Sequence, residues 1–273
     1  AHGVSKIRIT GGEPLVRRGI IEFLKDLSSI KGVEDLSITT NGVLLKDYAA
    51  KLKEAGLRRV NVSLDSLNRD RFQKMTRGDN LEDVLDGLRE SEYVGLTPVK
   101  VNMVVIKGFN DDEIIAFANL SKERPWHIRY IEYMPFNTQE GWQKDKCLSA
   151  KEIKDLISQQ AGELFPVTHG LGGAGPARRF KFKDAPGEIG LISPVSEHFC
   201  GSCNRLRLTA DGKIRTCLFS DNEIDLRTAL RDGSNDDAIE RLLFQAVAEK
   251  PSQHHINENV FKKCSRTMSL IGG

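Results

Sequence analysis

Three cysteines and two arginines are the residues of this sequence best suited to chemistry. Cys200 and Cys203 are separated by two residues, Cys217 follows, and Arg205 and Arg207 lie between them. A structural zinc ion takes four protein ligands in a closed tetrahedron, and a [4Fe–4S] cluster has four irons to ligate. Three thiolates therefore leave one coordination position open beside fixed positive charge. This arrangement predicts an anionic substrate brought to a metal or cluster.

The cysteine spacing alone leaves other interpretations open. A redox dithiol or a chance spacing also fits, because a C-x-x-C pair occurs in several contexts. His198 is close enough in sequence to act as a fourth ligand, which would favour zinc, although a histidine beside a cysteine is more often structural. Cys147 and Cys264 are isolated and are expected to be inert thiols.

A second candidate site follows the first apolar run, at Thr10-Gly-Gly-Glu13. Glycines let backbone amides approach a small polar ligand closely, and Glu13 can accept a hydrogen bond from an amine. An ordinary turn from a strand into a helix, with Pro14 and an acid facing solvent, explains the same residues. The sequence leaves both interpretations open.

Three cations interrupt otherwise apolar strand patterns: Arg8, Lys100 and Arg129. An unpaired charge is costly to bury, so each must point outward, neutralise a buried acid or meet an anionic ligand. If they face inward, we expect them to contact phosphates.

The run from Gly170 to Gly175 matches the spacing of a dinucleotide-binding fingerprint. That motif needs a strand before it and a helix at its end. Pro176 and a short β-like run follow instead, so we interpret the segment as a loop.

Composition restricts the class of protein. The 273 residues carry 40 basic and 38 acidic side chains, which gives no case for nucleic acid or a membrane as a partner. No apolar stretch approaches the roughly 18 residues of a membrane span, and the first residues do not resemble a signal peptide. Five cysteines, mostly clustered, favour a reducing compartment over a disulfide framework.

These residues must be positioned by an α/β fold with parallel strands. Strand-like and helical patterns alternate up to about Met134, and the strands are apolar enough to suggest burial on both faces. Strands are predicted at Lys6–Thr10, Asp35–Thr40, Arg59–Leu64, Val99–Ile106, Ile128–Tyr133, Arg179–Phe182 and Ile189–Ile192. Helices are predicted over 20–30, Leu45–Glu54, Leu226–Ala248, and after capping boxes at Asn110–Glu113 and Ser149–Glu152. Five strand–helix units are too few for a closed eight-stranded barrel, so an open or partial barrel or a doubly wound sheet is expected, with ligands beyond the carboxyl ends of the strands.

The character of the sequence changes after Pro135. We therefore predict two domains, residues 1–140 and 141–273, with a soft boundary between them.

Taken together, the motifs resemble the radical S-adenosylmethionine (SAM) GTP 3′,8-cyclases of molybdenum cofactor biosynthesis over essentially the whole chain. The matching segments are Arg8–Pro14, Thr39–Gly42, Asn61–Asp65, Val99–Asn102, Ile131–Pro135, Phe199–Arg207 and the terminal Ile271–Gly273. The GGEP segment alone indicates only the wider radical SAM superfamily. The cysteine cluster with its two arginines and the double-glycine end are far more specific.

The resemblance implies a partial (β/α) barrel of the radical SAM type, followed by a C-terminal α+β domain that carries a [4Fe–4S] cluster. Cys200, Cys203 and Cys217 would ligate this cluster, and its free iron would meet the guanine of GTP. The residues implied to contact SAM are Gly12, Glu13, Ser63 and Met134. Those implied to contact GTP are Arg8, Thr39, Lys100, Arg205 and Arg207. Gly272 and Gly273 would reach into the active site and, with Arg205 and Arg207, take part in catalysis.

The activity implied is conversion of GTP to 3′,8-cyclo-GTP by a 5′-deoxyadenosyl radical, which a second, N-terminal [4Fe–4S] cluster generates from SAM. The implied partners are GTP, an electron donor and, as the acceptor of the product, a downstream cyclic pyranopterin monophosphate synthase. A homodimer is compatible with the resemblance. The location implied is the cytoplasm, or the mitochondrial matrix in a eukaryote.

The sequence departs from the family pattern in one respect. Radical SAM enzymes carry a C-x3-C-x2-C triad before GGEP, whereas no cysteine here precedes Cys147. In addition, Gly3 lies directly before an apolar strand, where the cap of a finished helix is expected. We interpret the chain as a fragment that lacks the segment with the triad and is inactive alone.

Two other functions remain open from the sequence. A radical SAM peptide maturase also carries cysteines in a C-terminal extension, although such extensions generally use more of them. A non-enzymatic, metal-stabilised nucleotide-binding module is the second alternative.

Overall fold

The computed structural model describes residues 3–134, 143–168, 175–254 and 265–271. Within them, eight strands form one mixed sheet in the order β1-β2-β3-β4-β5-β8-β7-β6. Neighbours from β1 through β5 to β8 are parallel, and the β8–β7 and β7–β6 pairs are antiparallel. The strands are β1 Lys6–Ile9, β2 Asp35–Thr40, β3 Arg59–Ser63, β4 Lys100–Val105, β5 His127–Glu132, β6 Phe165–Pro166, β7 Arg178–Lys181 and β8 Glu188–Ile192. The predicted parallel α/β organisation is confirmed.

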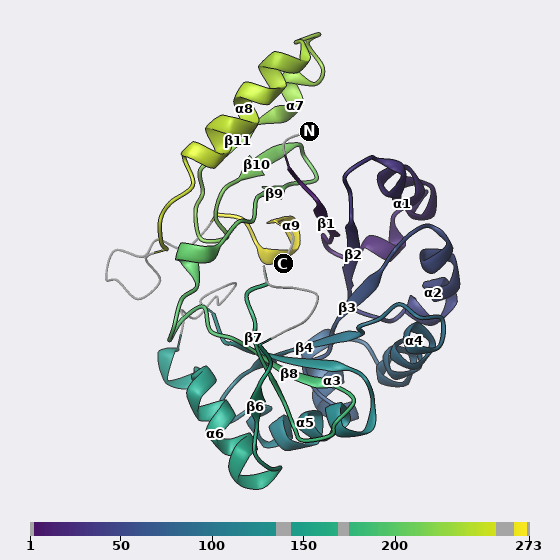
Figure 1. The fold of residues 1–273 in the computed structure, drawn as a ribbon, viewed down its shortest axis with the longest axis vertical. Coiled ribbons are helices and arrows are strands. Elements are labelled where there is room, and N and C mark those ends of the chain that lie inside the picture. Colours follow the sequence, from purple (N-terminus) through teal and green to yellow (C-terminus); the bar gives the residue numbers. More distant parts are fainter. Residues whose placement is uncertain (1–2, 135–142, 169–174, 255–264, 272–273) are drawn as a thin grey trace.

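Helices cover the outer side of this curved sheet (Figure 1). They are α1 Ile20–Ser29, α2 Leu45–Glu54, α3 Arg69–Thr76, α4 Leu81–Tyr93, α5 Ile114–Glu123 and α6 Ala150–Gln160. The core between sheet and helices is apolar, with Val60, Val101 and Met103 fully buried. Gly87 lets α4 approach α2 closely, because a Cβ atom there would lie 2.9 Å from the Cβ atom of Leu45, the first residue of α2.

The inner face of the sheet is largely polar, although the centres of β2, β3 and β5 are buried on both faces as predicted. Side chains alternate between the two faces of a strand, so Lys100 and Asn102 share a face opposite to Val101 and Met103. Lys100 pairs in register with His127 of β5, and Asn61 of β3 pairs with Lys100. Val101 and Met103 thus face the helices, and the other face presents charged and amide groups, with Val104 and Ile131 beside them.

A smaller antiparallel sheet lies across the open side of the curved sheet (Figure 1). Its strands are β9 Arg207–Leu208, β10 Lys213–Arg215 and β11 Glu223–Asp225, and α7 Leu226–Ala229 and α8 Asp236–Ala248 follow. Ile214, Ile224 and Ala246 form its separate apolar cluster. The helix predicted over Leu226–Ala248 is therefore two helices, because Asn235 caps a new start by accepting a hydrogen bond from the Ala238 amide.

The two predicted capping boxes had different outcomes. Ser149 and Glu152 form the predicted box at the start of α6. Asn110 does not cap a helix: its side chain accepts from the Ile106 amide and donates to two backbone carbonyls. A short 3-10 turn, η2 Asp111–Glu113, precedes α5 instead.

The predicted domain boundary near residue 140 falls within the sequence span of one sheet. Strands β1–β5 precede it, and β6, β7 and β8 follow it in the same sheet. The division into two domains therefore stays a prediction. Among the residues that the structure describes, none belongs to a helix with the length and hydropathy of a membrane span.

Candidate functional site

Four cations lie on the inner polar face of the curved sheet, and we call them the cationic face: Arg8, Arg59, Lys100 and Arg129. Arg59 is neutralised by Asp35, with 2.5 Å between guanidinium nitrogen and carboxylate oxygen. Arg129 is 6% exposed and donates only to the amide oxygen of Asn61, at 3.3 Å. Within the described residues, the side chains of Arg8 and Lys100 form no hydrogen bond or ion pair. This face therefore has more positive charge than the chain's own carboxylates balance.

The pKa values of Lys100 and Arg129 are lowered, as an excess of positive charge on this face predicts. Burial, reinforced by the charges of Arg59 and Arg129, lowers the pKa of Lys100 to about 7. Burial and the charges of Arg8 and Arg59 lower the pKa of Arg129 to about 9. A bound anion would reverse both shifts, because an opposite charge within a few ångströms favours the protonated form.

The arginines of the C-terminal half belong to the same electrostatic environment. Burial is the main cause that lowers the pKa values of Arg8 and Arg129, and the charge of Arg205 adds to both. Burial followed by the charges of Arg205 and Arg8 lowers the pKa of Arg207 to about 10. The predicted contacts Arg8, Lys100, Arg205 and Arg207 are thus brought together. Arg59 and Asn61 lie on the same face and were missed, although their alternation with apolar residues in the sequence was a usable signal.

The Thr10-Gly-Gly-Glu13 turn is open on the side where β1 ends. A Cβ atom built on Gly11 or Gly12 would meet no other atom within 4 Å, and Gly11 has φ +143°. The turn thus leaves space for a ligand to approach its backbone. Glu13 holds the loop together: its carboxylate accepts from the Leu15 amide, the Thr40 hydroxyl and the Asn41 amide at 2.7–3.0 Å.

The other predicted SAM and GTP contacts lie at or near the carboxyl ends of neighbouring strands. Ser63 is exposed at the end of β3 and pairs in register with Asn102 of β4, whose amide oxygen is buried without a partner among the described residues. Thr39 lies near the end of β2 and pairs with Asn61, and Met134 is half-buried two residues after β5. Gly272 and Gly273 lie outside the described residues, as does the predicted loop at 170–174.

Cys200, Cys203 and Cys217 are free and half-buried. A single 3-10 turn, η4 Cys200–Ser202, brings the first two together, with the Cys203 amide donating to the Cys200 carbonyl at 3.0 Å. In the part of the chain that is described, no three His, Cys, Asp or Glu side chains are arranged to hold a metal ion. Cys200, Cys203 and Cys217 are therefore not drawn together into a three-ligand group among these residues.

The electrostatic surroundings of the cysteines suit a cluster ligand. Burial pushes the pKa of the Cys203 thiol upward, but hydrogen bonds from the backbone and side chain of Arg205 and the charge of Lys250 outweigh it and lower the pKa. The Lys250 ammonium donates to the carbonyls of Arg205 at 3.0 Å and Thr216 at 2.7 Å. It thereby ties together the two segments that carry Cys203 and Cys217. The donor set and its charge thus fit an anionic thiolate cluster.

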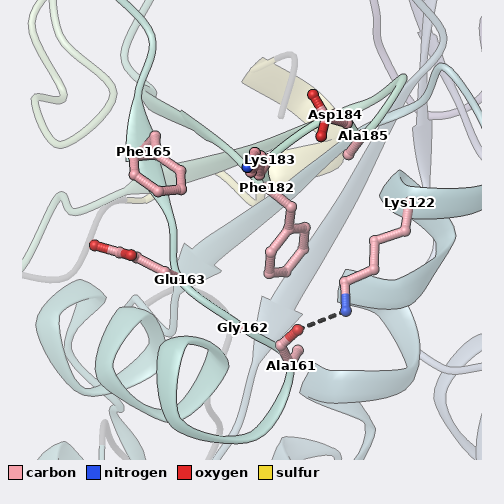
Figure 2. A pocket seen from close by; sticks show the side chains of 9 residues that line it. All are labelled: Lys122, Ala161, Gly162, Glu163, Phe165, Phe182, Lys183, Asp184 and Ala185. Carbon is pink, nitrogen blue, oxygen red and sulfur yellow. Dashed lines mark hydrogen bonds between the residues drawn. The ribbon is translucent and has the colours of Figure 1, made fainter.

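A shallow hollow of about 460 Å³ lies elsewhere, near α5, α6 and the β6–β7 edge (Figure 2). It is lined by Lys122, Ala161, Gly162, Glu163, Phe165, Phe182, Lys183, Asp184 and Ala185. Lys122 is already engaged, because it donates to the Ala161 carbonyl and lies 4.5 Å from the centroid of the Phe182 ring. None of the predicted site residues lines this hollow.

The chain matches two family models. The radical SAM superfamily model matches residues 1–121, and the "Molybdenum Cofactor Synthesis C" model matches residues 126–256. The chain is 48% identical to a GTP 3′,8-cyclase of Pelotomaculum thermopropionicum, in an alignment that covers 99% of this chain and 82% of that protein. The chain is also 46% identical to a GTP 3′,8-cyclase of Alkaliphilus metalliredigens, in an alignment that covers 100% of this chain and 82% of that protein. The alignments reach nearly every residue of this chain and 82% of each relative, and the prediction that the chain is a fragment stays a prediction.

Among solved structures, a domain of a pyruvate-formate lyase-activating enzyme from Bacteroides vulgatus is 20% identical. The match covers 56% of this chain and 90% of that one, with a TM-score of 0.45. This likeness is too loose to support a conclusion about function.

Proposed function

This chain belongs to the GTP 3′,8-cyclase family of radical SAM enzymes, and on that premise we propose that its cationic face and its cysteine loops bind GTP for conversion to 3′,8-cyclo-GTP. The reaction serves molybdenum cofactor biosynthesis. The proposed architecture is a partial barrel that holds SAM at its strand ends, closed by a C-terminal domain with residues 141–273.

The observation that carries the proposal is the surplus of positive charge on the cationic face. Lys100 has no anionic partner among the described residues, and Arg129 has only a long hydrogen bond to an amide oxygen. Cations in such surroundings lower the stability of the folded protein, and a bound polyanion would offset this cost. The triphosphate of GTP matches this face, and the planar guanidinium groups of Arg205 and Arg207 suit phosphate oxygens.

SAM is assigned to the strand ends beside this face. Gly12 would allow its methionine moiety to approach the backbone, and Ser63 and Met134 would contact it. Glu13 would accept from its amino group with the lone pairs that the Thr40, Leu15 and Asn41 donors leave free.

Cys200, Cys203 and Cys217 would hold a [4Fe–4S] cluster whose fourth iron contacts the guanine. When bound, such a cluster supplies an open Lewis-acidic iron. The chain's own contribution is to lower the pKa of Cys203 and to fix the spacing of the two cysteine segments through Lys250. Gly272 and Gly273 would reach the same site.

Anaerobic titration with GTP tests the proposal directly. We expect the iron-reconstituted protein to bind GTP and Lys100→Met to bind it more weakly. Lys151→Met is the matched control, because Lys151 is a surface lysine on α6 whose side chain is 78% exposed. Equal affinity of Lys100→Met and the wild type would refute the assignment of the phosphate site.

We propose separately that these 273 residues alone do not carry out the radical reaction. None of the five cysteines is spaced as C-x3-C-x2-C, so the chain offers no ligand triad for a radical-generating cluster. We expect no 5′-deoxyadenosine from the protein after reconstitution with iron and sulfide. Its detection by chromatography would contradict this expectation while leaving the GTP site open to the titration above.

The partners of the reaction follow from the same function. An electron donor, a downstream cyclic pyranopterin monophosphate synthase, a homodimeric state and a cytoplasmic location all stay predictions.

A further inference from the structure

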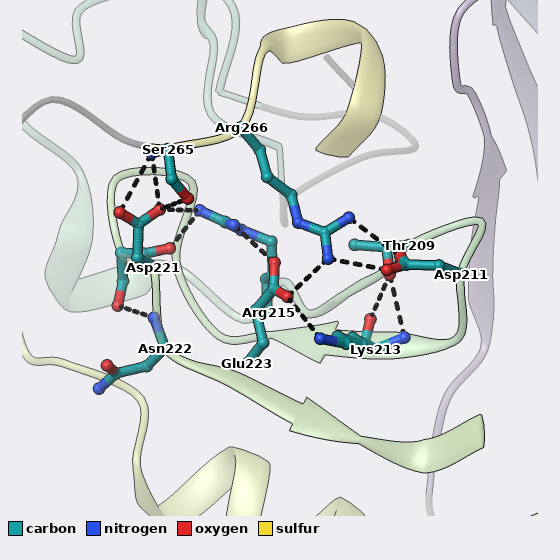
Figure 3. Close-up of polar contacts among 10 residues, drawn as sticks. Thr209, Asp211, Lys213, Arg215, Asp221, Asn222, Glu223, Ser265 and Arg266 are labelled. Carbon is teal, nitrogen blue, oxygen red and sulfur yellow. Dashed lines mark hydrogen bonds and ion pairs between the residues drawn. The ribbon is translucent and has the colours of Figure 1, made fainter. Parts of the chain in front are cut away.

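The C-terminal segment is fastened to the small sheet by a network of charges that the proposed function does not use (Figure 3). We call this network the latch: Ser265, Arg266, Asp211, Arg215, Asp221 and Glu223. The bonds of Ser265 and Arg266 join residues 43 to 55 positions apart in the sequence. The latch therefore fixes tertiary structure and not a local turn.

Arg266 makes the central contact of the latch. Its two terminal nitrogens donate to the two carboxylate oxygens of Asp211 at 3.0 and 2.8 Å, and one of them also donates to Glu223 at 2.8 Å. A bidentate pair of this kind fixes both distance and orientation. The Arg266 side chain is 21% exposed, and that of Glu223 is 12% exposed. The Arg266–Glu223 contact is thus partly withdrawn from solvent, unlike an ordinary surface ion pair, whereas Asp211 is 43% exposed.

Ser265 adds a backbone anchor immediately before Arg266. Its amide donates to both carboxylate oxygens of Asp221 at 3.0 and 3.1 Å, and its hydroxyl donates to the same carboxylate at 3.0 Å. Two consecutive residues are therefore held by acids on two different loops of the small sheet.

Arg215 holds these acids in place from inside the small sheet. It is fully buried, donates to Glu223 at 2.7 Å, and also contacts the Ser220 carbonyl and Asp221. Glu223 therefore bridges Arg215 and Arg266 through its two oxygens. Arg215 stands directly opposite Arg207 in the β9–β10 pair. Like charges in this position destabilise a strand pair, so neutralising Arg215 helps to keep Arg207 in place.

The latch determines where the last described helix lies. That helix, α9 Met268–Ile271, begins two residues after Arg266, and Ile271 is 2% exposed. Figure 1 shows α9 beside the small sheet, on the inner side of the curved sheet. A segment held at one end by Arg266 and buried at the other has little freedom to leave this position.

We infer that Arg266, with Asp211 and Glu223, is a positioning residue that seats the C-terminal segment beside the GTP site, while Arg215 keeps Arg207 in register with that site. This inference rests on the proposed function, since the ligand affected is GTP. Neither Arg266 nor its acids need to touch the ligand.

Hydrogen exchange and GTP titration on the reconstituted full chain test the inference together. In Arg266→Met we expect the amides of residues 265–271 to exchange at least tenfold faster, with exchange in β4 unchanged, and GTP affinity to fall at least fivefold. Arg266→Lys should recover part of both effects, because it keeps the charge but not the bidentate fork. Arg69→Met is the matched control, since Arg69 forms a bidentate pair with Asp79 on the surface.

Asp211→Asn provides a milder variant that keeps the shape of the side chain. If both residues act through the latch, the double variant Arg266→Met with Asp211→Asn should be no worse than Arg266→Met alone. Unchanged exchange in residues 265–271 would overturn the latch, and faster exchange with unchanged GTP affinity would overturn its positioning role. A wild-type protein that binds no GTP would instead overturn the proposed function, and the exchange rates would still decide whether the latch exists.

Discussion

The cationic face and the latch use the same kinds of side chain in opposite surroundings. On the face, Lys100 lies among other cations, and burial with their charges lowers its pKa to about 7. In the latch, the hydrogen bonds that Arg266 donates to Asp211 and Glu223 outweigh the opposing effect of burial and raise the pKa of Arg266. The hydrogen bonds that Arg266 and Thr209 donate to Asp211 lower the pKa of that carboxyl group.

The direction of these shifts separates two uses of charge. A cation whose pKa is lowered in the folded protein costs folding free energy, and we propose that such cations are retained for a ligand. A cation whose pKa is raised by carboxylates already has its partners and contributes to the fold. Arg215 and Arg129 make the contrast sharpest, because both are arginines with little or no exposure but only Arg215 forms ion pairs.

The largest expected effect comes from removing the buried arginine of the latch. Arg215→Met leaves Glu223 and Asp221 without their buried partner, and we expect the free energy of unfolding to fall by about 3 kcal/mol. Denaturant titration of the ligand-free protein measures it. Arg69→Met, on a surface ion pair, should cost less than about 1 kcal/mol. If both variants lose the same amount, the latch is no more than a surface feature.

On the cationic face we expect the reverse of the latch: a substitution should weaken ligand binding without lowering the stability of the protein. Lys100→Met should weaken GTP binding by about 2 kcal/mol, roughly 30-fold, since a charge-assisted contact is lost. The same change should not lower the free energy of unfolding of the ligand-free protein, because it removes an unpaired cation. Calorimetric titration measures the GTP affinity, and denaturant unfolding measures the free energy of unfolding. A variant that loses stability but keeps GTP affinity would place Lys100 with the structural cations.

The local elements of the fold could be predicted closely from the sequence. Helix α2 and strand β2 have the predicted bounds, and the Ser149–Glu152 box caps α6, because each depends on residues a few positions apart. The prediction of burial on both faces holds at the centres of β2, β3 and β5, but the polar character of one face was missed. Lys100 and Arg129 were taken as charges that interrupt apolar strands. They mark the inner face instead.

The candidate site was predicted in part for the same reason. Arg8, Lys100 and Arg129 were noticed as charges out of place, which is a local signal. The latch was missed, because Asp211 and Arg266 are 55 residues apart and only the fold of the small sheet brings them together. No spacing within the sequence indicates such a pair.

Lys250 is a third kind of cation, whose partners are carbonyl groups. Its ammonium donates to the Arg205 and Thr216 carbonyls. We expect Lys250→Met to lower the affinity of the cysteine site for its cluster about tenfold, because loss of an outer partner of a metal site has an effect of this size. Iron content after anaerobic reconstitution and desalting measures it, with Lys151→Met as the control. Full iron occupancy at limiting iron would show that the cysteine segments keep their spacing without Lys250.

The smallest expected effect is the pH dependence that Lys100 gives to the ligand-free protein. Its pKa is about 7 when folded and near 10.4 when unfolded, so between these values the unfolded state binds more protons and stability rises with pH. From pH 7 to pH 8 we expect the wild type to gain about 1 kcal/mol relative to Lys100→Met. GTP affinity should fall over the same interval, because the ammonium that meets the phosphates loses its proton. Stability and affinity that change in the same direction with pH would mean that Lys100 is paired in the folded protein, and the contrast with the latch would no longer hold.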